Sequence, residues 1–242
     1  MAGFGFDQAF SFSSTGFGTG FGHPEHLVGS ALFNGIDSFL KIENRSEFFP
    51  GTDDFTVEWW QKSLEGIVSN ARIFSIGIWN SANFAFSVED NAYVWLNHKL
   101  YDMESYGSVN GSWHHFAAVR KSTVLNVYKD GINISGPGLV STDDVVADLA
   151  KYFAVGNETE DGITSNYSNG FKGYLSCFHL VIGSALYSGN FSRPTAPPIP
   201  DSNTKLLLKF LSPGNKLLAD SSVLENSVTN VNNVIWSSES PF

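Results

Sequence analysis

The chain has 242 residues, enough for one large domain that buries about 70–75% of its unfolded surface and needs neither disulfides nor metal to hold a core. The residues are 42% hydrophobic and 14% aromatic, which excludes an intrinsically disordered chain. A net charge of −10 argues against nucleic acid as a partner, because phosphate binding needs a basic face. The single cysteine, Cys177, excludes an internal disulfide.

The sequence shows no sign of membrane targeting or of a bound cofactor. Residues 1–12 contain no basic residue and no unbroken apolar run, so they do not predict a secretory leader. No stretch approaches the roughly 18 apolar residues that a transmembrane helix requires. No glycine-rich loop follows a predicted strand and opens a helix, as a phosphate-binding loop does. We therefore expect no membrane partner and no cofactor.

Residues 1–26 form a segment rich in glycine and phenylalanine. Glycine at this density makes ordering of the backbone costly, so the segment is not expected to fold by itself. Two interpretations remain open: an unstructured leader, or an extended arm whose rings anchor in the grooves of a partner. The second interpretation makes six rings candidate partner-binding residues: Phe4, Phe6, Phe10, Phe12, Phe17 and Phe21.

From residue 27 onward the pattern is typical of successive strands. Residues 54–59 alternate apolar and polar side chains with the period of a strand. Residues 84–96 and 115–128 each predict a hairpin, and Asp130 with Gly131 supplies the two-residue turn after the second one. Further strands are expected at residues 72–79, 132–134, 152–155, 173–182 and 205–210.

No window has the apolar periodicity of a helix, and β-branched and aromatic residues dominate the periodic runs. Prolines at residues 194–200 predict an extended crossing, because proline cannot donate to a central ladder. Residues 201–242 are too few for a core of their own and should close the same domain. The sequence therefore predicts an all-β fold, an antiparallel two-sheet sandwich over residues 27–242. The side chains expected to face inward are Phe55, Val57, Trp59, Phe116, Ala118, Val127 and Leu175.

The order of these segments resembles the laminin G-like, concanavalin A-like jelly-roll family. The matching motifs are FNGIDSFL (33–40) as the opening strand, DFTVEWW (54–60), GSWHHFAAVR (111–120) with VYKDG (127–131), and GFKGYLS (170–176). Residues 183–197 and the serine-rich C-terminus are similar to a version of the module found in marine phage and large-virus structural proteins. The resemblance implies a jelly roll that binds glycans or proteins, in some members with calcium, and a virion setting.

The residues offer no catalytic constellation. Glucanases of this fold carry Glu-x-Asp-x-x-Glu on one strand, where alternate residues share a face, and this string is missing here. His179 stands alone, and the neighbours His114 and His115 should point to opposite faces of a strand, so all three are interpreted as structural. Cys177 is expected to be a small core residue. The sequence thus predicts a protein that is not an enzyme.

Four loop carboxylates are candidate calcium ligands. Asp37, Asp130, Glu158 and Asp161 carry the oxygen atoms that calcium prefers. Turn and cap chemistry accounts for Asp37 and Asp130 as well, and no loop has the carboxylate density of a calcium site. We expect no metal.

Two functions follow from these observations. The main hypothesis is a non-enzymatic structural protein of a virion (a decoration, minor capsid or tail-associated subunit), mounted by residues 1–26 on other virion proteins or on copies of itself. The alternative is a lectin-like glycan-binding module for attachment to a host cell. Exposed aromatic rings bind sugars by stacking. Trp59, Trp95 and Trp113 are expected in the core, whereas packing and glycan contact both remain open for Trp79, Tyr101 and Tyr106.

Overall fold

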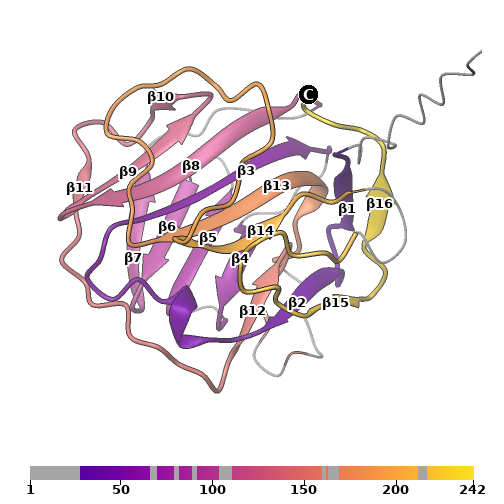
Figure 1. Cartoon of the computed structure of the whole chain (residues 1–242), viewed down its shortest axis with the longest axis horizontal. Coiled ribbons are helices and arrows are strands. Elements are labelled where there is room, and N and C mark those ends of the chain that lie inside the picture. The colour runs from indigo at the N-terminus through magenta and orange to yellow at the C-terminus, as the bar shows by residue number, and fades with distance from the viewer. Residues whose placement is uncertain are drawn as a thin grey trace, which may run out of the picture.

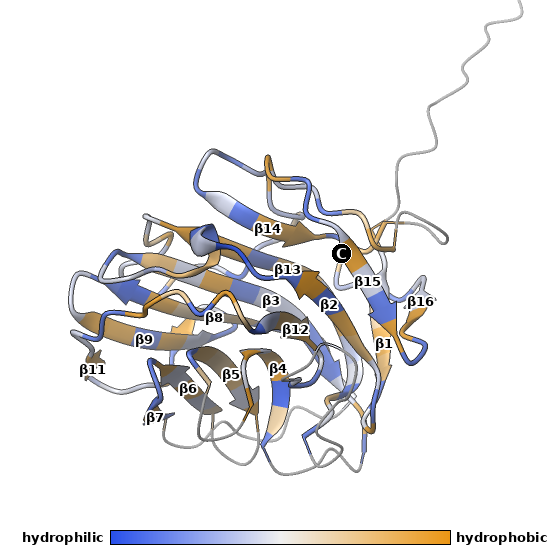
Figure 2. Cartoon of the chain, turned by 90° about the horizontal axis from the view of Figure 1, so that it is seen from below, coloured by the Kyte–Doolittle hydropathy of each residue, from blue (hydrophilic) through white to orange (hydrophobic). Residues whose placement is uncertain are grey.

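A computed structural model of the protein describes residues 28–65, 70–78, 82–88, 92–103, 111–159, 162, 169–211 and 217–242. Within these residues the fold is all-β, as predicted: two antiparallel sheets stack as a sandwich (Figure 1), and Figure 2 shows them as two layers. One 3-10 turn, η1 (Ser46–Phe48), is the helical element of this part of the chain. No helix in the described ranges has the length and apolar character to cross a membrane.

The larger sheet has nine strands in the described part of the chain. Its main path runs β10-β9-β8-β3-β13-β1-β16, with β11 added to β9 and β14 added to β13. The strands are β1 (Ser30–Asn34), β3 (Phe55–Ser63), β8 (His114–Lys121), β9 (Val124–Lys129), β10 (Ile132–Asn133), β11 (Leu139–Val140), β13 (Lys172–Ile182), β14 (Thr204–Leu208) and β16 (Ile235–Ser237).

The smaller sheet has seven strands in the same described ranges, in the order β15-β2-β12-β4-β5-β6-β7. They are β2 (Phe39–Glu43), β4 (Ala71–Ile76), β5 (Phe84–Val88), β6 (Ala92–Leu96), β7 (Lys99–Met103), β12 (Tyr152–Val155) and β15 (Val228–Val231). The chain after the proline-rich crossing thus contributes to both layers, since β14 and β16 lie in the larger sheet and β15 in the smaller one.

The core lies between the two sheets and is aromatic. All seven side chains that alternation placed inward are at most 1% exposed and belong to one hydrophobic cluster, so that prediction is confirmed. Trp59 of β3 joins the two layers, since its ring meets Phe86 of β5 edge-on at 4.6 Å and stacks with Phe116 of β8 at 5.8 Å. Its indole N–H donates to Gln61 Oε1 at 2.8 Å, which satisfies the polar end of the ring.

The motif at residues 33–40, expected to be one opening strand, is instead the junction of two strands in different sheets. The chain leaves β1 at Asn34, turns through Gly35 at φ +76°, and enters β2 at Phe39. The Asn34 side-chain oxygen accepts hydrogen bonds from the backbone N–H groups of Ile36, Asp37 and Ser38. An asparagine that holds three turn amides and a glycine with positive φ together end the strand.

Both predicted hairpins are present, as β5–β6 and β8–β9. Asp130 and Gly131 both have positive φ, +50° and +80°, as a tight turn between β9 and β10 requires. A Cβ atom on Gly131 would lie 1.9 Å from the backbone oxygen of Phe191. Glycine is therefore required at this turn by the close approach of a second segment as well as by its φ angle.

A β-bulge in β13 sets the direction of one histidine. The pairing of β13 with β3 shifts between Ser176 and His179, and Cys177 has a φ of +49°. Without the bulge, His179 would share the inward face of Leu175. With it, Phe178 enters the core and His179 lies opposite Glu58 on the outward face of the sheet.

Candidate functional site

The outer face of the nine-stranded sheet, which points away from the seven-stranded sheet, is partly covered by residues 183–203, here called the strap. Figure 1 shows the strap in orange as it crosses β8 and β9. Its backbone is tied to the residue just before β3, where Gly183 N–H donates to Asp54 O at 2.8 Å, and to the β9–β10 turn, where Phe191 N–H donates to Gly131 O at 2.9 Å. The rings of Tyr187 and Phe191 stack at 3.6 Å and pack over Tyr128.

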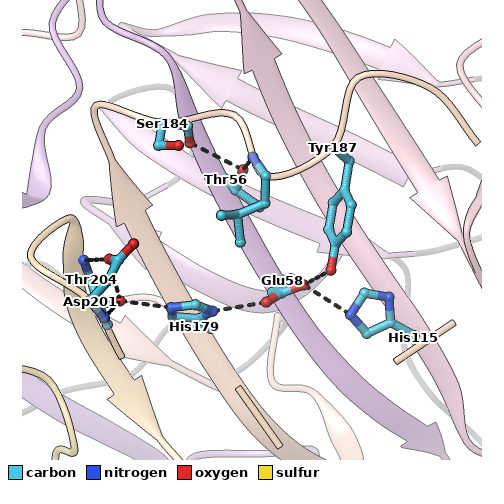
Figure 3. A network of polar contacts seen from close by, with 9 residues as sticks. Thr56, Glu58, His115, His179, Ser184, Tyr187, Asp201 and Thr204 are labelled. Carbon is cyan, nitrogen blue, oxygen red and sulfur yellow. Dashed lines mark hydrogen bonds and ion pairs between the residues drawn. The ribbon is translucent and has the colours of Figure 1, made fainter. Parts of the chain in front are cut away.

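Beneath the strap lies a network of polar contacts around Glu58 (Figure 3). The Glu58 carboxylate is 2.8 Å from His179 Nδ1, 3.2 Å from His115 Nε2, and accepts a hydrogen bond from Tyr187 Oη at 2.6 Å. His179 Nε2 lies 3.1 Å from Thr204 Oγ1. The network therefore joins β3, β8, β13, β14 and the strap at one buried carboxylate.

Glu58 is ionised in the folded protein. Burial favours the neutral acid, but hydrogen bonds and charge from His115 and His179 outweigh burial and lower the Glu58 pKa to about 2. Burial and the Glu58 charge in turn raise the pKa of Tyr187, so its hydroxyl stays protonated and donates. A buried carboxylate that is held ionised by three donors is a structural anchor and is unsuited to donate a proton as a general acid.

The expectation from the sequence that His179 stands alone is wrong. His179, expected to stand alone, shares Glu58 with His115. The bulge at Cys177 is the cause, because it brings His179 to the same face of the sheet. Cys177 itself is buried, and burial raises its pKa to about 12, as suits the inert core residue that was predicted.

Further along β3, the outer face becomes accessible to solvent. Lys62 lies opposite Tyr174 of β13, with its ammonium 5.5 Å from the centre of the tyrosine ring. Trp113, just before β8, meets Tyr174 with ring centroids 6.3 Å apart and planes tilted by 52°. Trp113 and Tyr174, here called the aromatic pair, are both partly exposed. Trp113 was expected in the core, and that prediction is wrong because the residue precedes the strand instead of lying inside the sandwich.

Trp60 lies between the aromatic pair and the strap on β3. Its ring is only 2% exposed, because Phe242 meets it edge-on at 5.5 Å and the Arg193 guanidinium lies 5.1 Å from its centre. Glu239, near the C-terminus, forms an ion pair with Lys62 at 2.5 Å. On the outer face of β3, Lys62 is therefore partly exposed, Trp60 is covered by two side chains, and Glu58 is buried beneath the strap.

A second buried polar cluster lies on the outer side of the seven-stranded sheet. Arg72 Nε donates to Glu158 Oε2 at 2.8 Å, and both side chains are 0% exposed. Asn169 donates to the other oxygen of Glu158 at 2.7 Å, and the Arg72 guanidinium lies 4.2 Å from the centre of the Trp95 ring. This cluster connects β4 to the chain that follows β12. Its two charges are fully buried, so we interpret it as structural.

The carboxylates considered for calcium have protein partners where the structure describes them. Asp37 accepts a hydrogen bond from Asn34, and Asp130 accepts one from His115 N–H and lies 2.6 Å from His114 Nδ1. Glu158 is paired with Arg72, and Asp161 lies outside the described residues. In the described ranges, no group of three or more histidine, cysteine or acidic side chains is placed to hold a metal ion.

Of the three predicted glycan-contact residues, one can be located. Tyr101 is 5% exposed, packs in the main core, and donates its hydroxyl hydrogen bond to Asp143, so its ring has little surface for a sugar. Trp79 and Tyr106 lie outside the described residues, as do the six arm rings Phe4, Phe6, Phe10, Phe12, Phe17 and Phe21.

Comparison with known proteins gives the class to which this fold belongs. Residues 34–183, more than half of the chain, match the family model of the concanavalin A-like lectin/glucanases superfamily. The chain therefore belongs to this superfamily, and the resemblance drawn from the motifs is confirmed. The comparison with curated proteins returned no related sequence.

Two solved structures show the same fold at low sequence identity. A candidate carbohydrate-binding protein of Bacteroides ovatus aligns with 89% of this chain at a TM-score of 0.61 and 13% identity. The heptameric SAP-like pentraxin of Limulus polyphemus aligns with 88% of this chain and 96% of its own at a TM-score of 0.59 and 18% identity. The chain spans 61% of the Bacteroides protein.

Proposed function

We propose that this protein is a non-catalytic glycan-binding domain and that the aromatic pair on the outer face of the nine-stranded sheet is its contact surface. The observation that carries the proposal is the placement of Trp113 and Tyr174, two partly exposed rings in mutual contact, beside the charged side chain of Lys62. Rings offer a face to the C–H groups of a sugar, and the ammonium donates to its hydroxyl groups.

The superfamily and its structural neighbours support a glycan as partner over a virion protein. The Bacteroides protein of the same fold is itself a candidate carbohydrate-binding protein. The mounting of residues 1–26 on a particle, and location in a virion, stay predictions of the sequence, because the arm lies outside the described residues.

Replacing Trp113 or Tyr174 with alanine is expected to weaken glycan binding at least about tenfold, as loss of a stacking ring costs more than about 1.4 kcal/mol at a binding hot spot. A glycan array on the full chain would select the ligand, and calorimetry would measure the affinities of wild-type and variant proteins. Ile235→Ala, a change at a half-exposed residue on β16 of the same sheet, is the matched control. Unchanged affinity in the Trp113→Ala/Tyr174→Ala double variant would show that glycans bind elsewhere. An array without any bound glycan would remove the proposed function.

We also expect the wild-type protein to release no product from β-glucans, sialosides or peptides. Two imidazoles and a phenol hold Glu58 ionised, whereas glycoside hydrolysis needs a pair of carboxyl groups of which one carries a proton. Chromatography of the incubated substrates would check this. Turnover that disappears in Glu58→Gln would contradict the assignment as a binding domain.

A further inference from the structure

The C-terminal segment, residues 238–242, covers part of the outer face. Figure 1 shows it in yellow, running from β16 toward the ends of β3 and β8. Two of its side chains contact β3: Glu239 pairs with Lys62, and Phe242 packs against Trp60. Glu239 and Phe242 are each 43% exposed, so this cover is itself at the surface.

The attachment of this segment is weak. The backbone N–H groups of Glu239 and Phe242 donate to the hydroxyls of Ser237 and Ser240, within β16 and the segment, and not to the sheet beneath. The segment is held on β3 by one ion pair at the surface, which contributes little to stability, and by the edge-on contact of Phe242 with Trp60. A ligand with better contacts to the same side chains can therefore displace the segment.

Glu239 and Phe242 of the segment also contact the side chains that a sugar chain would bind. Glu239 occupies the ammonium of Lys62, which lies against the aromatic pair, and Phe242 occupies the ring of Trp60. Trp60 and Lys62 are two residues apart on β3, so their side chains share a face and their backbones are about 6–7 Å apart. A saccharide stacked on the aromatic pair reaches Trp60 with its next units.

We infer that Trp60 is a third ring of the binding surface, covered by Phe242 as well as by Arg193, and that a linear oligosaccharide gains contact with it by displacing residues 238–242. This inference rests on the proposed function and adds a ligand class to it: chains of several sugar units in place of single sugars. A monosaccharide or disaccharide contacts only the aromatic pair and leaves Phe242 in place. Longer chains gain the contact with Trp60 but must compete with the segment.

The test is a length series of one array-selected glycan, measured by calorimetry on the wild-type protein, Phe242→Ala and Glu239→Gln/Phe242→Ala. We expect both variants to bind the long oligosaccharides about 5- to 30-fold more tightly than wild type, a common range for coupling between two competing contacts. Phe242→Ala, which keeps the Glu239–Lys62 ion pair, should bind the monosaccharide with unchanged affinity. Val223→Ala, a change at a residue 64% exposed, is the control and should change neither.

A fluorine label on the ring of Phe242, read by nuclear magnetic resonance, reports the displacement directly. Its signal should move on addition of the long oligosaccharide and stay in place with the monosaccharide. The inference would be overturned if the variants bind long chains equally or more weakly than wild type, or if the fluorine signal never moves. Glycan binding by the wild type would in that case still support the proposed function. If neither wild type nor variants bind any glycan, the proposed function fails and this inference fails with it.

Discussion

Replacing Trp59 with alanine is expected to lower the free energy of unfolding by about 3–5 kcal/mol, the range for a large buried aromatic side chain. Trp59 is 0% exposed and contacts rings of both sheets, so its loss opens a cavity at the centre of the sandwich. It also removes the indole donor from Gln61, a buried side chain. Chemical denaturation monitored by circular dichroism would measure the change.

Trp113→Ala serves as the matched control for this experiment. The same side chain is deleted, but from a partly exposed position, and we expect a loss below about 1 kcal/mol. A loss at Trp59 no larger than that at Trp113 would mean that the two faces of β3 have been assigned the wrong way round.

Glu58→Gln is expected to destabilise the protein by about 2–4 kcal/mol at pH 7. The amide keeps the shape of the side chain but removes the charge that two imidazoles and the Tyr187 hydroxyl approach, and partners of a removed buried charge lose strong hydrogen bonds. Because Tyr187 belongs to the strap, hydrogen exchange should also show faster exchange of strap amides in this variant. Glu43→Gln, at an exposed ion pair, should change stability by less than about 0.5 kcal/mol.

The contribution of Glu58 should also depend on pH in a defined direction. Its pKa is about 2 in the folded protein against an ordinary value of 4.5, so its stabilising effect is complete above about pH 4.5 and is lost as the pH falls toward 2. The difference in unfolding free energy between wild type and Glu58→Gln should therefore shrink over that interval. A difference that stays constant from pH 7 to pH 3 would show that Glu58 is not held ionised by its neighbours.

Period-two alternation was enough to predict the layers of this protein. The two hairpins and the seven inward side chains follow from which residues are apolar, because a strand between two sheets must bury every second side chain. The FNGIDSFL motif, which the resemblance implied to be the opening strand, instead contains a turn, because the side chain of Asn34 and the φ of Gly35 end β1.

The site residues were less predictable, for reasons that lie in tertiary contacts. Tyr101 sits in a polar stretch, yet its ring fills the core and its hydroxyl reaches Asp143, 42 residues further along the chain. Trp113 sits at the start of an apolar strand, yet it stays at the surface against Tyr174 of a strand more than fifty residues away. Whether an aromatic ring at the end of a strand packs inward depends on the space that the neighbouring strands leave in the core. The local sequence pattern carries no information about that space.

By itself, the sequence determined the fold class, the two hairpins and the inward side chains of the core strands, because these depend on local period and on the cost of exposing large apolar side chains. Only the tertiary structure decided which polar groups meet. Cys177 has a φ of +49°, a conformation that the sequence does not mark with a glycine, and the bulge there turns His179 outward to Glu58. The strap and residues 238–242 then cover β3, although both are distant from it in the sequence. Such contacts depend on the register between strands and on where distant segments cross the sheet. The energy of each contact therefore depends on a partner that is remote in sequence.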